Sequence, residues 1–190
     1  MKPSPSLDVK ILCLRIAAVT KPVRDEVDTL VAAWRRERPD LDTAPMEVLS
    51  RVSRLAHHLD RRRAAAFSAH GLERWEFDVL AALRRSGAPY QLTPGQLLRE
   101  TLVTSGTMTN RVDRLVDRNL VSRYDHPGDR RGVLVRLTDQ GRESVDAALA
   151  DLLDAERAML SRVSDADLSQ LVATLRQLLA EGEADDPLNR

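Results

Sequence analysis

The stretch that decides the fold is SGTMTNRVDRLVDRN, residues 105–119. Its apolar side chains recur at positions i, i+4, i+7 and i+8, the spacing of one helical face: Met108, Val112, Leu115 and Val116. The front of this helix carries short polar residues, among them Ser105, Thr109 and Asn110. Short side chains let a bulky partner approach the backbone. A DNA groove and an anionic ligand are the candidates, with bare solvent as the simplest alternative.

The composition describes a globular protein without a strong overall charge. The chain has 190 residues, 43% of them hydrophobic and 31% charged, which suits one domain with an additional arm. Its 29 basic and 29 acidic residues cancel, so a nucleic-acid site must be a local basic patch. The single cysteine, Cys13, excludes an internal disulfide and a cysteine-rich zinc site. With no apolar run long enough to span a bilayer, we expect a cytoplasmic protein without cofactor or metal.

The ends of the chain are expected to flank a helical body. Residues 1–20 have no assigned role and are either a disordered leader or lie upstream of the true start. The region 21–44 is expected to provide an extra N-terminal helix and a linker. Helical dimerisation regions are expected at 46–70 and 139–181. The last segment, 182–190, is expected to be a flexible tail.

Between these regions, residues 72–138 are expected to form a DNA-binding domain. Helices are predicted at 72–87 and 92–102, with Gly71 ending the helix before them. Residues 120–138 read as two strands of a hairpin around DHPGDRRG. Three helices, a recognition-type helix, a hairpin and two long helices together predict a mainly α (α+β) fold. This is a winged helix-turn-helix with helical dimerisation arms from both termini.

A helix-turn-helix places its second helix in the major groove, where the N-terminal residues reach base edges. The candidates for these contacts are Thr104, Ser105, Thr107, Thr109 and Asn110. Asn110 suits bidentate recognition of adenine. The charged hairpin loop contains Asp129, Arg130 and Arg131, and we expect Arg131 to enter the minor groove with Asp129 holding it in place. A helical turn facing water and a solvated charged loop are the simpler alternatives.

The segment GTMTNRVDRLVDRNLVSRYDHPGDRRGVLVRLTDQG resembles the signature of the MarR family of bacterial transcription regulators, over about residues 46–181. The resemblance implies a homodimer built by the terminal helices, in which each subunit presents one recognition helix and one wing to a palindromic operator. WRRERPDLD, EFDVLAALRRSGAPYQL and SGTMTNRVDRL together resemble the urate-responsive, PecS/HucR-like branch. That branch carries an extra N-terminal helix. The trans-aconitate-responsive, TamR-like regulators are close relatives that share much of this pattern.

The same resemblance implies a ligand site made of Trp34, Asp78, Arg85 and Arg111. Asp78 and Arg85 are two helical turns apart and therefore share a face. Arg111 points away from the apolar stripe, where we expect it to pair with Asp78. An entering anion would break that pair at a cost of about 3–5 kcal/mol if it is buried, more than the usual allosteric coupling of about 1–3 kcal/mol. The plainer interpretation puts Trp34 in a dimer core and leaves Asp78 and Arg85 as surface charges.

The predicted function is a DNA-binding regulator, a repressor, that a small anionic metabolite releases from its operator. Urate or a related purine is the first candidate effector, and a carboxylate such as trans-aconitate or an aromatic acid is the alternative. A protein-interaction module that has lost DNA binding is a second alternative. An enzyme is not expected, because one acid with two arginines offers no nucleophile or general base. The four histidines, two of them adjacent, do not form a metal-binding pattern.

Overall fold

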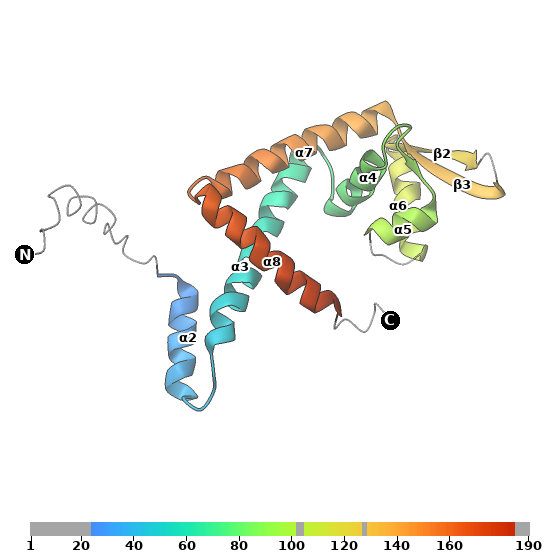
Figure 1. The fold of residues 1–190 in the computed structure, drawn as a ribbon. Coiled ribbons are helices and arrows are strands. Elements are labelled where there is room, and N and C mark those ends of the chain that lie inside the picture. Colours follow the sequence, from blue (N-terminus) through green and yellow to red (C-terminus); the bar gives the residue numbers. More distant parts are fainter. Residues whose placement is uncertain (1–23, 102–104, 127–128, 185–190) are drawn as a thin grey trace, which may run out of the picture. The chain divides into compact units, whose positions relative to one another are not determined.

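The computed structural model describes residues 24–101, 105–126 and 129–184 (Figure 1). The predicted leader 1–20 and Thr104 lie outside these residues, as does most of the predicted tail. The chain divides into two compact units, Met1–His57 and His58–Arg190, and each is described by itself. No helix in the described ranges is both long and apolar enough to cross a membrane.

The first unit contains α2 (Glu26–Glu37) and the first half of α3 (Ala44–Ala69). The carboxylate of Asp25 caps α2 by accepting a 2.8 Å hydrogen bond from the Val27 N–H, which satisfies one of the free donors at a helix start. The α2 face that meets α3 is apolar, with Val27 and Val31 buried. Helix α2 lies within the region 21–44, for which the sequence predicts an extra N-terminal helix.

A cluster of ion pairs joins these two helices. Arg51 of α3 binds Asp25 at 2.8 Å, Asp28 at 2.9 Å and Glu47 at 2.8 Å. All of these side chains are about one-third to one-half exposed, so each pair alone stabilises the contact weakly. Asp25 and Asp28 on one guanidinium set the position of α2 along α3, and Glu47 of α3 itself orients that guanidinium.

The second unit carries the rest of α3 and the remaining elements. In chain order these are α4 (Arg74–Arg85), β1 (Gln91–Leu92), α5 (Pro94–Thr101), α6 (Ser105–Asp117), β2 (Val121–His126), β3 (Asp129–Leu137), α7 (Asp139–Leu160) and α8 (Asp165–Ala184). The helix starts follow local chemistry: the Thr93 hydroxyl accepts from the Gln96 N–H at the head of α5, and the Thr138 hydroxyl accepts from the Gly141 N–H at the head of α7. Both are N-cap bonds.

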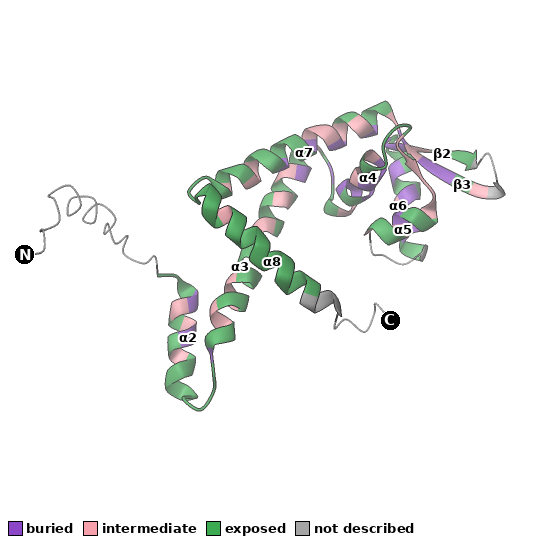
Figure 2. Ribbon diagram, viewed as in Figure 1, coloured by how far each residue is buried: buried purple, intermediate pink, exposed green. Residues whose placement is uncertain are grey.

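The apolar stripe of α6 faces the core of this unit. Met108, Val112 and Leu115 of α6 are at most 2% exposed, whereas Val116 lies at the edge with 36% exposed. They pack against apolar residues of α4, α5, β3 and α7. Figure 2 shows the buried residues concentrated on α4, α6 and β3, while α8 is largely exposed. The stripe therefore leaves the opposite, polar face of α6 toward solvent.

The sheet has three antiparallel strands in the order β1-β3-β2. The hairpin of β2 and β3 was expected, but β1 was not, because a strand of two residues is too short to show a period in the sequence. The charged loop is also shorter than expected. Asp129 pairs with His126, so Asp129, Arg130 and Arg131 begin β3 instead of lying at the tip of a loop.

The fold class expected from the sequence is confirmed: the chain is mainly helical with a small antiparallel sheet, in a winged helix-turn-helix arrangement. Helices α5 and α6 form the helix-turn-helix, and β2 with β3 forms the wing (Figure 1). Both long C-terminal helices keep large apolar side chains in solvent. These are Leu149, Leu153, Leu160, Leu171, Val172, Leu175, Leu178 and Leu179.

Candidate nucleic-acid interface

The polar front of α6 lies on the surface. Thr107, Thr109 and Asn110 are exposed in the first two turns of the helix, where a recognition helix offers side chains to base edges. Ser105 is the first residue of α6, but its side chain lies outside the described part of the chain. The arrangement places the predicted base-contacting residues of the described range on one exposed end of one helix.

The wing is held against α6 and β1 by arginine contacts. Arg123 of β2 pairs with Asp113 of α6 at 2.5 Å. Arg136 of β3 donates to the Gln91 side chain from both Nε and Nη2, at 2.9 and 2.6 Å, and lies 4.4 Å above the ring centre of Tyr124. The predicted wing residues Asp129, Arg130 and Arg131 begin the strand that these contacts hold in place, although their side chains lie outside the described range.

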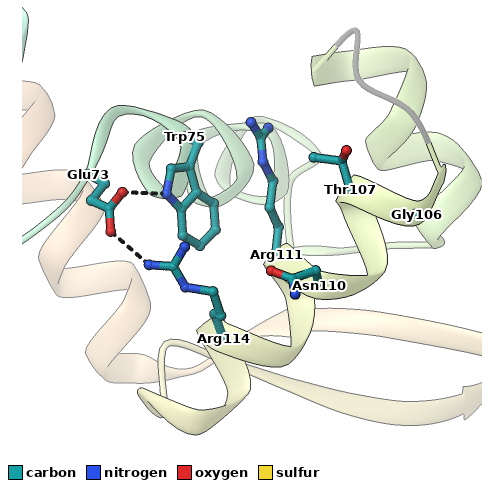
Figure 3. Close-up of a pocket in the computed structure, with 7 residues that line it drawn as sticks. All are labelled: Glu73, Trp75, Gly106, Thr107, Asn110, Arg111 and Arg114. Atoms are coloured by element: carbon teal, nitrogen blue, oxygen red, sulfur yellow. Dashed lines mark hydrogen bonds and ion pairs between the residues drawn. The ribbon is translucent and has the colours of Figure 1, made fainter.

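An open cleft of about 570 Å³ lies between the beginning of α4 and the exposed face of α6. Four of its five α6 residues recur at i, i+3, i+4 and i+7 from Thr107, the spacing of one helical face. Figure 3 shows this group with the indole of Trp75 at its centre. The lining residues are Glu73, Trp75, Gly106, Thr107, Asn110, Arg111 and Arg114. The cleft therefore shares Thr107 and Asn110 with the predicted DNA-reading surface.

The cleft combines an aromatic ring with two guanidinium groups. Arg114 lies 4.7 Å and Arg111 5.5 Å from the ring centre of Trp75, within the range of cation–π attraction. The indole Nε1 donates a 2.8 Å hydrogen bond to one carboxylate oxygen of Glu73, and Arg114 donates to the other at 2.8 Å. The bond from Trp75, and then the one from Arg114, hold the pKa of the Glu73 carboxyl below its ordinary value.

These contacts leave positive charge in excess. Glu73 is ionised at neutral pH and neutralises Arg114, whereas Arg111 has no ion pair with any carboxylate of the described residues. A guanidinium beside an indole binds planar anions well, because the ring face stacks and the fork of N–H groups matches carboxylate or oxyanion geometry. The cleft is chemically suited to a small flat anion.

The predicted ligand residues are only partly brought together. Arg111 lines the cleft, while Asp78 and Arg85 are exposed on α4, and Arg85 pairs with Glu100 of α5 at 3.3 Å. Trp34 lies on α2 in the first unit and is 46% exposed. Its partnership with residues of the second unit stays a prediction.

The expected Asp78–Arg111 ion pair is not formed in the described structure, and this expectation is corrected. The Arg111 guanidinium lies against the Trp75 ring instead. Asp78 is exposed, as the plainer interpretation of a surface charge had it, and helical spacing could not show how far along α4 the arginine would reach. Trp75 is one turn nearer the start of α4 on a similar face, and its ring supplies the attraction.

Glu73, Trp75 and Arg114 belong to this site and were not expected from the sequence. A signal was present: Arg111 and Arg114 are three residues apart and so share a helical face. Trp75 stands at the helix start, where it packs against the edge of the core and also reaches the cleft. Among the described residues, no group of three or more His, Cys, Asp and Glu side chains is placed to hold a metal ion.

Comparison with known proteins agrees with this geometry. A model described as MarR family matches residues 70–132, which run from α4 to the first residues of β3. The chain is 39% identical over 150 residues to the HTH-type transcriptional regulator PecS of Dickeya dadantii, covering 79% of this chain and 90% of that protein.

Two solved structures extend the comparison. AbsC of Streptomyces coelicolor, described as a MarR family transcriptional regulator, has a TM-score of 0.65 at 18% identity, covering 76% of this chain and 99% of that one; it shows the shared fold. BpsR of Bordetella bronchiseptica, whose DNA binding is described as regulated by 6-hydroxynicotinic acid, has a TM-score of 0.52 at 26% identity, covering 67% of this chain and 98% of that one. The chain therefore belongs to the MarR family and is a DNA-binding transcriptional regulator, not an enzyme.

Proposed function

We propose that this regulator is a repressor that binds a palindromic operator as a homodimer and is released by a small planar anion. The observation that carries the proposal is the cleft on α6, where Trp75 and Arg111 lie beside Asn110. An anion held there would occupy the same helical face that must meet DNA. Effector and operator would then compete for α6 directly, without the Asp78–Arg111 pair expected from the sequence.

The homodimer is supported by the apolar surface of the C-terminal helices. The large apolar side chains exposed on α7 and α8 recur at helical spacing, as Leu171, Leu175, Leu178 and Leu179 do on α8. Extended exposed apolar surface of this kind marks an interaction site. A second copy of the chain would cover it and present two recognition helices, related by a two-fold axis, to the half-sites of a palindrome.

Urate or a related purine is the first candidate effector, because a flat oxyanion matches an indole flanked by guanidinium groups and PecS is among the relatives. A carboxylate such as trans-aconitate or an aromatic acid is the alternative. The description of BpsR, which names a hydroxylated aromatic acid, favours the aromatic member of this second class.

A gel-shift titration tests the proposal. The protein is titrated against DNA flanking its own gene, with and without urate, xanthine, trans-aconitate and 6-hydroxynicotinate, at one fixed salt concentration because phosphate contacts make affinity strongly salt-dependent. Specific binding that one anion reverses supports the proposal. Specific binding that is indifferent to every anion would remove the effector, and binding without sequence preference would favour the interaction-module alternative.

The two tryptophans locate the effector. The chain contains only Trp34 and Trp75, so Trp34→Phe and Trp75→Phe each leave a single indole. If the cleft holds the effector, the fluorescence of the Trp34→Phe protein should change on titration with the effector. A response confined to the Trp75→Phe protein would move the site to Trp34, as the family resemblance implied.

A further inference from the structure

Glu76 is a carboxylate in the apolar core. Its side chain is fully buried, with 0% exposed, and it is the one buried charged residue among those that the structure describes. Its neighbours in sequence on α4, Phe77 and Val79, belong to the core cluster. Moving a carboxylate from water into such a place is unfavourable unless it is paired and hydrogen-bonded. The hydrogen-bond partners of the Glu76 carboxylate therefore indicate its role.

Those partners come from two elements. One Glu76 oxygen accepts a 2.8 Å hydrogen bond from the Glu73 N–H, which completes the capping box of α4. The same carboxylate accepts from Nη1 of Arg118 at 2.5 Å. The second branch of that guanidinium, Nη2, donates to the Gly71 carbonyl at 2.8 Å. One arginine thus joins the turn between α3 and α4 to the first turn of α4.

Arg118 stands at the C-terminal end of the recognition helix. It follows Asp117, the last residue of α6, and its own N–H still donates to the Arg114 carbonyl at 3.2 Å. A cation is favourable at this end of a helix because the macrodipole is negative there. The carboxylate of Glu76 therefore holds the end of α6 opposite the residues that face DNA.

We propose that Glu76 is a positioning residue for DNA recognition: through Arg118 it sets the angle at which α6 presents its polar front. A helix of 13 residues is about 20 Å long. A tilt of about 5° at the Arg118 end would move the other end by roughly 2 Å over that length, enough to break base contacts that need hydrogen-bond geometry. The inference rests on α6 entering the major groove and is independent of the effector.

A second ion pair between α6 and the start of α4 shows how solvent exposure weakens the restraint on the helix. Arg114 and Glu73 also join α6 to the start of α4, at 2.8 Å, but their side chains are 52% and 58% exposed. Water competes for both partners of such a pair, so it restrains the helix weakly. Glu76 has no access to solvent, which leaves Arg118 as the partner that neutralises it. The Glu76–Arg118 pair is buried on its carboxylate side, while the Arg118 side chain is 42% exposed. Both Glu76 oxygens accept from that guanidinium, so this pair is the stronger restraint.

Glu76→Gln tests the proposal, because the amide keeps the volume and an acceptor but removes the charge that orients Arg118. The operator is first selected from a random DNA library by the wild-type protein. Affinities for this operator and for unrelated DNA are then measured at one salt concentration, together with thermal unfolding. We expect specific affinity to fall roughly tenfold, within the usual range of coupling between sites, while affinity for unrelated DNA changes by less than about twofold.

Asp60→Asn is the matched control. It removes a 2.7 Å ion pair to Arg74, the first residue of α4, whose partners are 49% and 58% exposed. This variant should keep wild-type affinity for both DNAs. Arg118→Lys provides the second test, because a lysine keeps the charge but cannot bind Glu76 and the Gly71 carbonyl with two planar branches. Arg118→Lys should lose affinity for the operator as Glu76→Gln does. The double variant should bind the operator no more weakly than whichever single variant has the lower affinity, because the two residues act through one contact.

Two results would overturn the proposal. In the first, the Glu76→Gln and Arg118→Lys proteins fold and their affinity for the operator stays within about twofold of wild type. Coupled positioning predicts a larger change. The other is an equal loss of affinity for operator and unrelated DNA that follows a fall in thermal stability, because that pattern belongs to a purely structural role. If Glu76→Gln does not fold, Arg118→Lys alone decides between these outcomes.

Discussion

Gly141 of α7 lies so close to the Leu120 carbonyl that a Cβ at Gly141 would stand 2.0 Å from its oxygen. The approach belongs to a junction where α6, β2 and α7 meet. The Thr138 N–H donates to the same carbonyl at 3.2 Å. The Thr138 hydroxyl accepts from the Gly141 N–H and donates to the Asn119 carbonyl. The end of the recognition helix, the start of the wing and the start of α7 are therefore held by backbone contacts.

Gly141→Ala should destabilise the protein, because the new methyl group meets backbone that cannot move aside. Overpacking of this kind usually costs about 1–3 kcal/mol or more. Chemical denaturation followed by circular dichroism measures the change. Gly95→Ala is the control, since a Cβ there meets nothing closer than 4.0 Å. Equal stabilities of the two variants would mean that the junction yields more easily than its geometry implies.

Leu115 and Val116 are neighbours on α6 with opposite environments. Leu115 has 0% and Val116 36% of its surface exposed. Leu115→Ala should lower the free energy of unfolding by about 2–5 kcal/mol, the usual cost of a cavity at a buried leucine. Val116→Ala should change it by less than about 1 kcal/mol, since less area leaves water. The same denaturation experiment measures both, and equal losses would contradict the assigned orientation of the helix.

This orientation was predictable from the sequence, because a stripe that repeats every three to four residues has one possible inner face. The hairpin and the breaks at Gly71 and Gly87, both with positive φ, follow from similarly local rules. Short-range pairings were not predictable. Strand β1 exists because Gln91 and Leu92 pair with β3. Two residues are too few to show a strand pattern, so their sequence does not reveal a pairing with a distant strand.

Only part of the cleft was predictable, because its residues come from two helices that are distant in the sequence. Arg111 was identified through the family resemblance and does line the cleft. Its partner was not, because Trp75 lies 36 positions earlier in the chain and spacing within a helix says nothing of the distance between helices. Glu76 was missed for another reason: a glutamate at a helix start is typical of a surface cap, and its ion-pair partner Arg118 lies 42 residues later in the chain.

Asp25 should make the contact between α2 and α3 sensitive to acid. The hydrogen bond from Arg51 holds the pKa of the Asp25 carboxyl below its ordinary value of 3.8. A group with a lowered folded-state pKa stabilises the fold fully above its unfolded pKa, and the stabilisation is lost as the pH falls through the folded value. The protection of α2 should therefore be constant near neutral pH and decline below about pH 4.

Hydrogen-exchange mass spectrometry of α2 peptides, corrected for the intrinsic effect of pH on exchange, measures this decline. Asp25→Asn should lower the protection of α2 at neutral pH and flatten its dependence on acid. Glu37→Gln is the control, because that carboxylate is 66% exposed and pairs only with its neighbour Arg36 among the described residues. An unchanged acid profile in Asp25→Asn would show that other carboxylates around Arg51 dominate.

Asn110 and Arg131 should affect DNA binding in different ways. A side-chain amide reads one base pair, so Asn110→Ala should cost about 1–3 kcal/mol at the preferred operator and relax the preference at a single position. An arginine in the minor groove responds to shape and to phosphate charge, so Arg131→Ala should weaken binding to many sequences and reduce the salt dependence. Affinities for a panel of single-base operator variants at two salt concentrations separate the two patterns. If Asn110→Ala keeps the full base preference, the reading surface of α6 lies elsewhere.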